Sequence, residues 1–216
     1  MIRAGTTKEI KWDSGNWVFL DIGFANKSSS CGLLFGNDDP DEVTFNEATE
    51  IICEYLSKQQ QATNLVIEAP LSVSFDLKGN PKGRKPEKQN GKTRYWYVGL
   101  GCTVLVATFY LIKSITDSKP PAEVRLFEGF VSFKSKGKVS NHSKDVLLLR
   151  RAVKKTEPWN IISPKDLRMD ETDVISSAFK VGNMDYGVPP IIQNHDELAV
   201  NLTGEGSIDP TSLRWL

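Results

Sequence analysis

Cysteine, histidine and net charge are all scarce in this sequence, and each scarcity excludes a class of protein. The 216 residues include three cysteines and no C-x-x-C pair, so a disulfide framework is excluded. The two histidines argue against a Ser-His-Asp triad. Lys plus Arg and Asp plus Glu both total 27, so no overall field favours nucleic acid, and binding of phosphate would depend on a local patch.

The start of the chain lacks the apolar segment of a signal peptide, so a cytoplasmic protein is expected. One uncharged run, residues 95–112, lies between Arg94 and Lys113 and is near the lower length limit for a membrane span. Its glycines, threonines and cysteine dilute its hydrophobicity. We therefore expect a buried central helix and no membrane partner, with a membrane span at 95–112 as the minor alternative.

The hydrophobic pattern predicts an α/β fold with a mixed central sheet, an N-terminal hairpin and flanking helices. Hydrophobic residues make up 39% of the chain and charged residues 25%, as in a globular domain. Strands are expected at 17–24, 31–36, 64–69 and 123–127, with a short extended piece at 43–45. Helices are expected at 46–61, over the uncharged run, at 141–155 behind a Ser140 cap, and at 167–180. Residues 71–93 are expected to form a long loop, and the last 30 residues to be irregular.

Four carboxylates stand out because of their positions in these elements. Asp21 interrupts an apolar strand, Glu68 ends another, and Asp170 and Asp173 are three residues apart at the start of the last expected helix. A charge within an apolar strand costs several kcal/mol unless it is paired or binds a metal. Oxygen ligands in this number suit Mg²⁺ or Mn²⁺.

Each carboxylate also has an ordinary structural explanation. Asp170 and Asp173 would serve equally well as the cap and first-turn acid of a helix. Glu68, before Pro70, would also fit a solvated strand end. Asp21 is the hardest to explain in this way, because strands disfavour Asp and its neighbours are apolar. The metal-site hypothesis depends on the combination of the four.

The order of these motifs resembles the RNase H-like nuclease superfamily, and its RuvC-type branch in particular. The resemblance rests on LDIG in a first strand with a hairpin behind it, VIEAP in a later strand, and DETDVISSAF opening the last expected helix. The segment IEAPLS, the Arg- and Glu-bearing loop after it, and Phe127-Glu128 at a strand end also resemble a little-characterised family of predicted RuvC-like nucleases. The chain departs from the pattern in its short or absent third strand and in its C-terminal 30 residues.

The resemblance implies a metal-dependent nuclease that hydrolyses phosphodiester bonds of DNA or RNA with two Mg²⁺ or Mn²⁺ ions. It places Asp21, Glu68, Asp170 and Asp173 as catalytic metal ligands. Glu128 is a further candidate that would support the ligands from behind, although a plain strand-end charge is favoured. The nuclease domain would span residues 1–182, with 183–216 as an irregular extension of the same domain.

A basic loop supplies the expected nucleic-acid surface. Its candidate contacts are Lys82, Arg84, Lys85, Lys88, Lys92 and Arg94, followed by the aromatic residues 95–97. Cations next to aromatics suit phosphate contact together with base stacking. A second basic stretch holds Lys134, Lys136, Lys138 and Lys144. Ordinary solvated surface charge explains either stretch equally well.

Two other functions stay open. The first is a non-catalytic nucleic-acid-binding module on the same fold, although retention of all four acids favours an enzyme. The second is an actin-like ATPase type of phosphate-binding domain, which shares the LDIG hairpin but usually needs two such domains. A P-loop ending at Gly91-Lys92-Thr93 is rejected, because Pro86 stands where the motif needs its first glycine.

Overall fold

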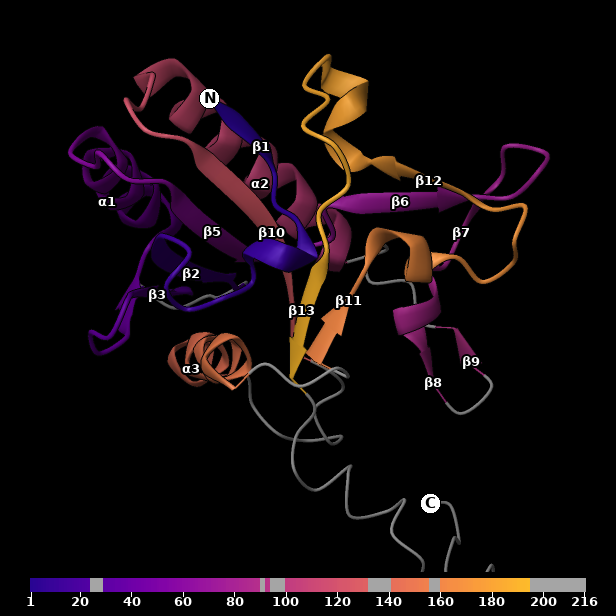
Figure 1. Cartoon of the computed structure of the whole chain (residues 1–216), viewed down its shortest axis with the longest axis horizontal. Helices are drawn as coiled ribbons and strands as arrows, with labels where there is room; N and C mark the ends of the chain where they lie inside the picture. Colours follow the sequence, from indigo (N-terminus) through magenta and orange to yellow (C-terminus); the bar gives the residue numbers. More distant parts are fainter. Residues whose placement is uncertain (24–28, 90–91, 94–99, 132–140, 156–159, 195–216) are drawn as a thin grey trace, which may run out of the picture.

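A computed structural model describes six stretches of the chain, residues 1–23, 29–89, 92–93, 100–131, 141–155 and 160–194. The chain is an α/β protein with a mixed eight-stranded sheet and helices on both of its faces (Figure 1). The predicted α/β class is therefore confirmed.

The sheet is built around four parallel strands. β2 (Asn16–Ile22), β5 (Thr63–Glu68), β10 (Val124–Val131) and β13 (Ile191–Asn194) run parallel in that order. β3 (Cys31–Phe35) pairs antiparallel with β2, and β4 (Asp41–Val43) continues the meander. β11 (Ile161–Ile162) lies antiparallel beside β13, and β1 (Ile2–Ala4) runs parallel to the first half of β10. The predicted hairpin and the strands at 64–69 and 123–127 are thus confirmed, and the third strand is present but short.

Two helices cover one face of this sheet and one helix covers the other. α1 (Phe45–Ser57) and α2 (Leu100–Ser118) bury apolar side chains against the even-numbered face of β2, which includes Leu20. α3 (His142–Lys154) packs on the opposite face, against Trp17 and Phe19 of β2. α1 and α3 are amphipathic, which made them predictable, whereas α2 was predicted from its uncharged run. α3 is capped by the side chain of Asn141, and the predicted cap, Ser140, lies outside the described residues.

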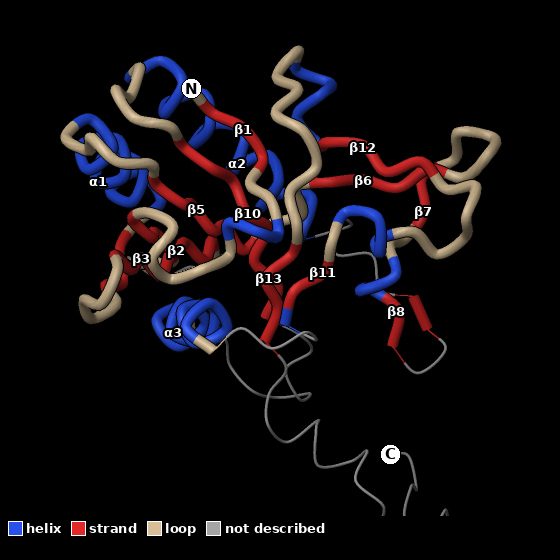
Figure 2. The backbone as a smooth tube through the Cα atoms, in the orientation of Figure 1, coloured by secondary structure: helices blue, strands red, loops and turns tan. Residues whose placement is uncertain are grey.

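A small antiparallel sheet stands apart from the main one, on the other side of the molecule from β2 and β3 (Figures 1 and 2). It consists of β12 (Val174–Ser177), β6 (Ser72–Phe75) and β7 (Pro81–Lys82), in that order. A short 3-10 helix, η2 (Lys85–Glu87), and the two-residue strands β8 (Lys88–Gln89) and β9 (Lys92–Thr93) follow β7. The expected loop at 71–93 is therefore largely structured. Further 3-10 helices are η1 (Thr7–Glu9), η4 (Pro164–Leu167) and η5 (Ala178–Gly182).

The predicted helix at 167–180 is wrong. This segment forms a turn, in which the Asp173 N–H donates to the Asp170 carbonyl, followed by β12 and η5. β12 pairs with β6, with Val174 opposite Phe75, and β-branched Val174 and Ile175 suit that arrangement. The C-terminal region is likewise not irregular throughout, because β13 lies in the main sheet.

The uncharged run at 95–112 contributes its described part to α2. This helix does not meet the length and hydropathy that a bilayer span requires, and neither does any other helix in the described stretches. Val104, Leu111, Ile112 and Ile115 of α2 are instead buried in the core. The predicted helix is therefore present, but it is buried on one side only, because Val106 and Tyr110 are exposed.

Candidate active site at the carboxyl ends of the parallel strands

Asp21 lies near the end of β2 on the face that α3 covers. Side chains alternate between the two faces of a strand, so Asp21 shares its face with Trp17 and Phe19, which pack against α3. The residue is only 5% exposed. A buried carboxylate at this position needs a compensating partner or cation.

Glu68 occupies the matching position on the next strand. β2 and β5 are parallel and in register, with Asp21 directly paired with Glu68. Glu68 lies on the same face as Val66, which packs against α3, so both carboxylates come from one face of the sheet. One Glu68 oxygen, Oε1, accepts a hydrogen bond from the Val131 N–H at 3.3 Å. Two of the four predicted carboxylates thus occupy paired positions on neighbouring strands.

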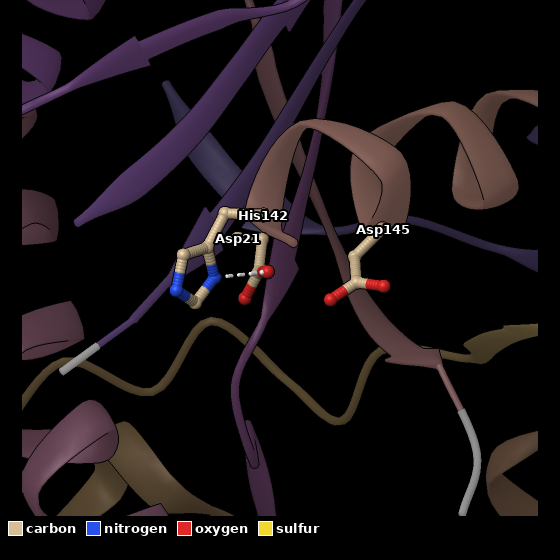
Figure 3. Close-up of side chains that lie close together, drawn as sticks. All are labelled: Asp21, His142 and Asp145. Atoms are coloured by element: carbon tan, nitrogen blue, oxygen red, sulfur yellow. Dashed lines mark hydrogen bonds and ion pairs between the residues drawn. The ribbon is translucent and has the colours of Figure 1, made fainter. Parts of the chain in front are cut away.

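The first turn of α3 brings two further polar side chains to this edge. His142 and Asp145 are three residues apart, which places them on the same side of the helix. His142 Nδ1 lies 2.6 Å from Asp21 Oδ2, and Asp145 lies beside them (Figure 3). One ligand atom of each of the three residues lies within 4.8 Å of the others, and no other such group occurs among the described residues.

The contact between His142 and Asp21 bears on which nitrogen of the imidazole carries a proton. An ionised carboxylate only accepts hydrogen bonds, so toward an ionised Asp21 the His142 tautomer that carries its proton on Nδ1 is the donor. The imidazole thereby orients the Asp21 carboxylate from the side of α3. Asp145 is 3% exposed, so the site contains two buried aspartates within a few ångströms of each other.

Two glycines make room for the start of α3. A Cβ on Gly32 of β3 would overlap the backbone carbonyl of His142, and a Cβ on Gly23 would overlap the His142 imidazole and the Ser30 carbonyl. The helix terminus therefore approaches the β2–β3 hairpin more closely than a residue with a side chain would allow. Glycine at both positions permits the contact between His142 and Asp21.

Asp170 and Asp173 do not belong to this site. They lie in the turn before β12, in the small sheet, where Lys82 Nζ contacts Asp170 Oδ2 at 2.6 Å and Asp173 Oδ1 at 2.9 Å. The other Asp173 oxygen accepts the backbone N–H groups of Met169 and Asp170. The hydrogen bond from Lys82 holds the pKa of Asp173 below its usual value. Their predicted role as metal ligands is corrected to that of a turn and ion-pair cluster.

Glu128 and Arg84 also differ from their predicted surroundings. Glu128 lies on β10 but faces the α1–α2 side, as Leu126 does, so it is on the opposite face from Asp21 and Glu68. Arg84 was predicted to contact nucleic acid, yet its side chain is fully buried and bound to Glu87 and Glu128. The favoured prediction of a solvated strand-end charge at Glu128 is therefore wrong, because the residue is fully buried.

The other predicted phosphate contacts have mixed outcomes. Lys85 and Lys88 are exposed and remain available, whereas Lys82 is half-buried in its pair with the two aspartates. The Lys92 side chain, Arg94 and the aromatic residues 95–97 lie outside the described residues. In the second basic stretch Lys144 is exposed at the start of α3, and its other three lysines are not described.

The sequence analysis missed His142 and Asp145. A usable indication was present, because a polar pair at i, i+3 opens a helix that follows directly on the strand containing Phe127. Polar residues in a first helical turn are common, however, and the D-E-T-D segment at 170–173 resembled the expected motif more closely.

Comparison with known proteins adds no assignment to this geometry. No model of a protein family matches the chain, and no curated protein or solved structure matches it either.

Proposed function

We propose that the chain is a metal-dependent nuclease whose site consists of Asp21, Glu68, His142 and Asp145. The observation that carries the proposal is the meeting of Asp21, His142 and Asp145 at the carboxyl end of β2 and the start of α3, with Glu68 at the paired position of the neighbouring strand β5. In open α/β sheets this edge is where ligands bind. The function is the one predicted from the sequence, with His142 and Asp145 in place of Asp170 and Asp173.

The strand order supports an RNase H-like arrangement. Three antiparallel strands, β2 to β4, are followed by the parallel β5 and β10 on the other side of β2, with α3 after β10. The resemblance implies an acidic pair on the last helix, and α3 is the last α-helix among the described residues. α3 takes that place, and its first turn carries H-x-x-D.

The donor set fits a hard divalent cation. Asp21 and Asp145 are buried carboxylates whose ionised forms need a compensating charge, and Glu68 supplies a further carboxylate from the paired strand position. These oxygens would hold Mg²⁺ or Mn²⁺. Bound ions would activate a water and stabilise the leaving oxygen of a phosphodiester.

In this site His142 would support metal binding indirectly, through its contact with Asp21. Its Nδ1–H orients the Asp21 carboxylate, as histidines and carboxylates that surround metal sites commonly do for one another. The exposed Lys85 and Lys88, in the segment that continues from β5 through the small sheet, supply positive charge for the phosphates of a DNA or RNA substrate.

Cleavage of a mixed panel of single- and double-stranded DNA and RNA in Mn²⁺ tests the proposal. The native chain should cut at least one substrate, and Asp21→Asn should lose that activity. Asp13→Asn, at an exposed aspartate, is the matched control and should cut normally. Nucleic-acid binding without any cleavage by the native chain would favour the non-catalytic module instead.

A further inference from the structure

A buried ionic cluster lies at the base of the small sheet, where it meets the end of β10. Arg84 donates from Nε and Nη2 to Glu87 Oε1, at 3.0 and 2.8 Å. Its Nη1 donates to Glu128 Oε2 at 2.8 Å and to Ser72 Oγ at 2.7 Å. The side chains of Arg84, Glu87 and Glu128 are at most 1% exposed. The cluster thus joins β6 and η2 to the main sheet.

Stability alone does not explain this cluster. It buries two carboxylates with one guanidinium, and Glu128 Oε1 is buried without a hydrogen-bond partner among the residues that the structure describes. Burial also raises the pKa of Glu87. Buried ion pairs of this kind are commonly no more stabilising than well-packed apolar residues of similar volume. The contacts of the cluster show instead which part of the backbone it holds.

The cluster holds the segment that follows β5, through the backbone of Leu71. Glu128 Oε2 also accepts the backbone N–H of Leu71 at 2.8 Å. The Leu71 carbonyl accepts from the Ala178 N–H at 2.9 Å. Both peptide groups of Leu71 are therefore held by other elements of the fold. Leu71 is three residues after Glu68, and the intervening Ala69 and Pro70 are buried.

Glu128 acts from the face of the sheet opposite to Glu68. β10 and β5 are in register, with Glu128 paired with Ile67, but the Glu128 side chain points toward the α1–α2 face. It is thus placed to hold the backbone that follows Glu68 without approaching the cluster of Asp21, His142 and Asp145.

We propose that Glu128 and Arg84 are positioning residues for Glu68. Through Leu71, they hold the end of β5 so that the Glu68 carboxylate faces Asp21 across the paired strands. This inference rests on the proposed function, since it assigns Glu68 to the metal site. It also gives Arg84 a role in place of the predicted nucleic-acid contact.

Mn²⁺ affinity of two variants at the same residue tests the inference. Glu128→Met removes the acceptor for the Leu71 N–H and leaves the Arg84–Glu87 pair balanced in charge. Glu128→Gln removes the charge but retains an oxygen that can accept from Leu71 and Arg84. We expect Glu128→Met to raise the Kd for Mn²⁺ about tenfold or more, and Glu128→Gln to restore it to within about threefold of the native value.

Hydrogen exchange at the Leu71 amide provides a readout that does not depend on metal. It should accelerate in Glu128→Met and stay slow in Glu128→Gln. Glu123→Met is the matched control, because Glu123 lies just before the other end of β10 and also pairs with arginines, Arg3 and Arg125. It should leave both Mn²⁺ affinity and Leu71 exchange unchanged.

The inference is overturned if Glu128→Met binds Mn²⁺ as the native chain does, or if Glu128→Gln loses as much affinity as Glu128→Met. If Glu128→Met does not fold, Arg84→Lys is the alternative variant, because it removes the guanidinium contacts to Glu128 and keeps the positive charge. Native Mn²⁺ affinity in Arg84→Lys would also overturn the inference. A native chain that binds no Mn²⁺ would instead contradict the proposed function, while the Leu71 exchange would still report whether Glu128 holds the segment.

Discussion

Two polar pairs with the same i, i+3 spacing occupy different surroundings in this protein. His142 and Asp145 open a helix that lies over the carboxyl ends of parallel strands, and they meet a second carboxylate, Asp21. Asp170 and Asp173 belong to a turn in the small sheet, and they meet a lysine, Lys82. The first pair thus lies against another acid, whereas the second pair is bound to a lysine.

This difference shows that spacing alone does not identify a metal site. Asp173 already has a lysine ammonium on one oxygen and two backbone N–H groups on the other. Asp21 and Asp145 are as deeply buried, but they lie next to another acid. A divalent cation would therefore relieve charge repulsion between Asp21 and Asp145, whereas at Asp170 and Asp173 it would displace existing ion pairs.

The largest effect that would separate the two pairs is on cleavage. Asp145→Asn should lower Mn²⁺-dependent cleavage by about 1000-fold, because the carboxylates act as one unit. For the same reason the double variant Asp21→Asn with Asp145→Asn should be no worse than either single variant. The double variant Asp170→Asn with Asp173→Asn should remain within about threefold of native activity once it is folded. Additive losses in the first double variant would show that Asp21 and Asp145 act separately.

A smaller effect is expected from closing the space next to His142. In Gly23→Ala the new methyl group would displace the imidazole from Asp21, so the Kd for Mn²⁺ should rise about tenfold. Gly182→Ala is a suitable control, since its Cβ would approach only the flexible end of Met184. Calorimetric titration of both variants measures the difference. Equal affinity in the two would mean that the His142–Asp21 contact does not support metal binding.

Binding of nucleic acid should depend more weakly on the two exposed lysines near the small sheet. Replacing Lys85 and Lys88 with Ala removes up to two phosphate contacts, which should reduce the slope of log K against log salt by about 1 to 2. The control is Lys58→Ala with Lys113→Ala, at exposed lysines of α1 and α2. A salt titration with metal-free protein measures the slopes. An unchanged slope in the Lys85 and Lys88 variant would place the substrate surface elsewhere.

The smallest effect concerns stability against pH at the second pair. Since Lys82 lowers the pKa of Asp173 in the folded chain, the stabilisation is fully present above the unfolded value of about 3.9. It is lost as pH falls through the lower folded pKa. Urea unfolding between pH 6 and pH 2.5 should therefore show a weaker pH dependence for Asp173→Asn than for the native chain. Identical pH dependence in both would contradict the ion pair.

Much of the main sheet was predictable because its signals are local. The apolar strands β2 and β5 and the amphipathic helices α1 and α3 are each recognisable within a dozen residues. The small sheet was not, because β12 pairs with β6 from a distant part of the chain, and strands of four residues carry little pattern of their own.

The residues of the site likewise include some that could be predicted from the sequence and some that could not. Asp21 and Glu68 could be predicted, because a carboxylate in or at the end of an apolar strand is a local anomaly. His142 and Asp145 could not be separated from an ordinary first helical turn, because their role depends on how α3 crosses β2. Arg84 looked like a surface cation because its loop is rich in lysine, and only the folded chain reveals its buried partners.

Mn²⁺ binding to Asp145→Asn and Asp173→Asn, measured by calorimetry at pH 7, tests the central claim most directly. The account predicts that Asp145→Asn raises the Kd at least about tenfold, whereas Asp173→Asn stays within about twofold of the native chain. Native affinity in Asp145→Asn together with lost affinity in Asp173→Asn would contradict it and would return the metal site to the turn before β12.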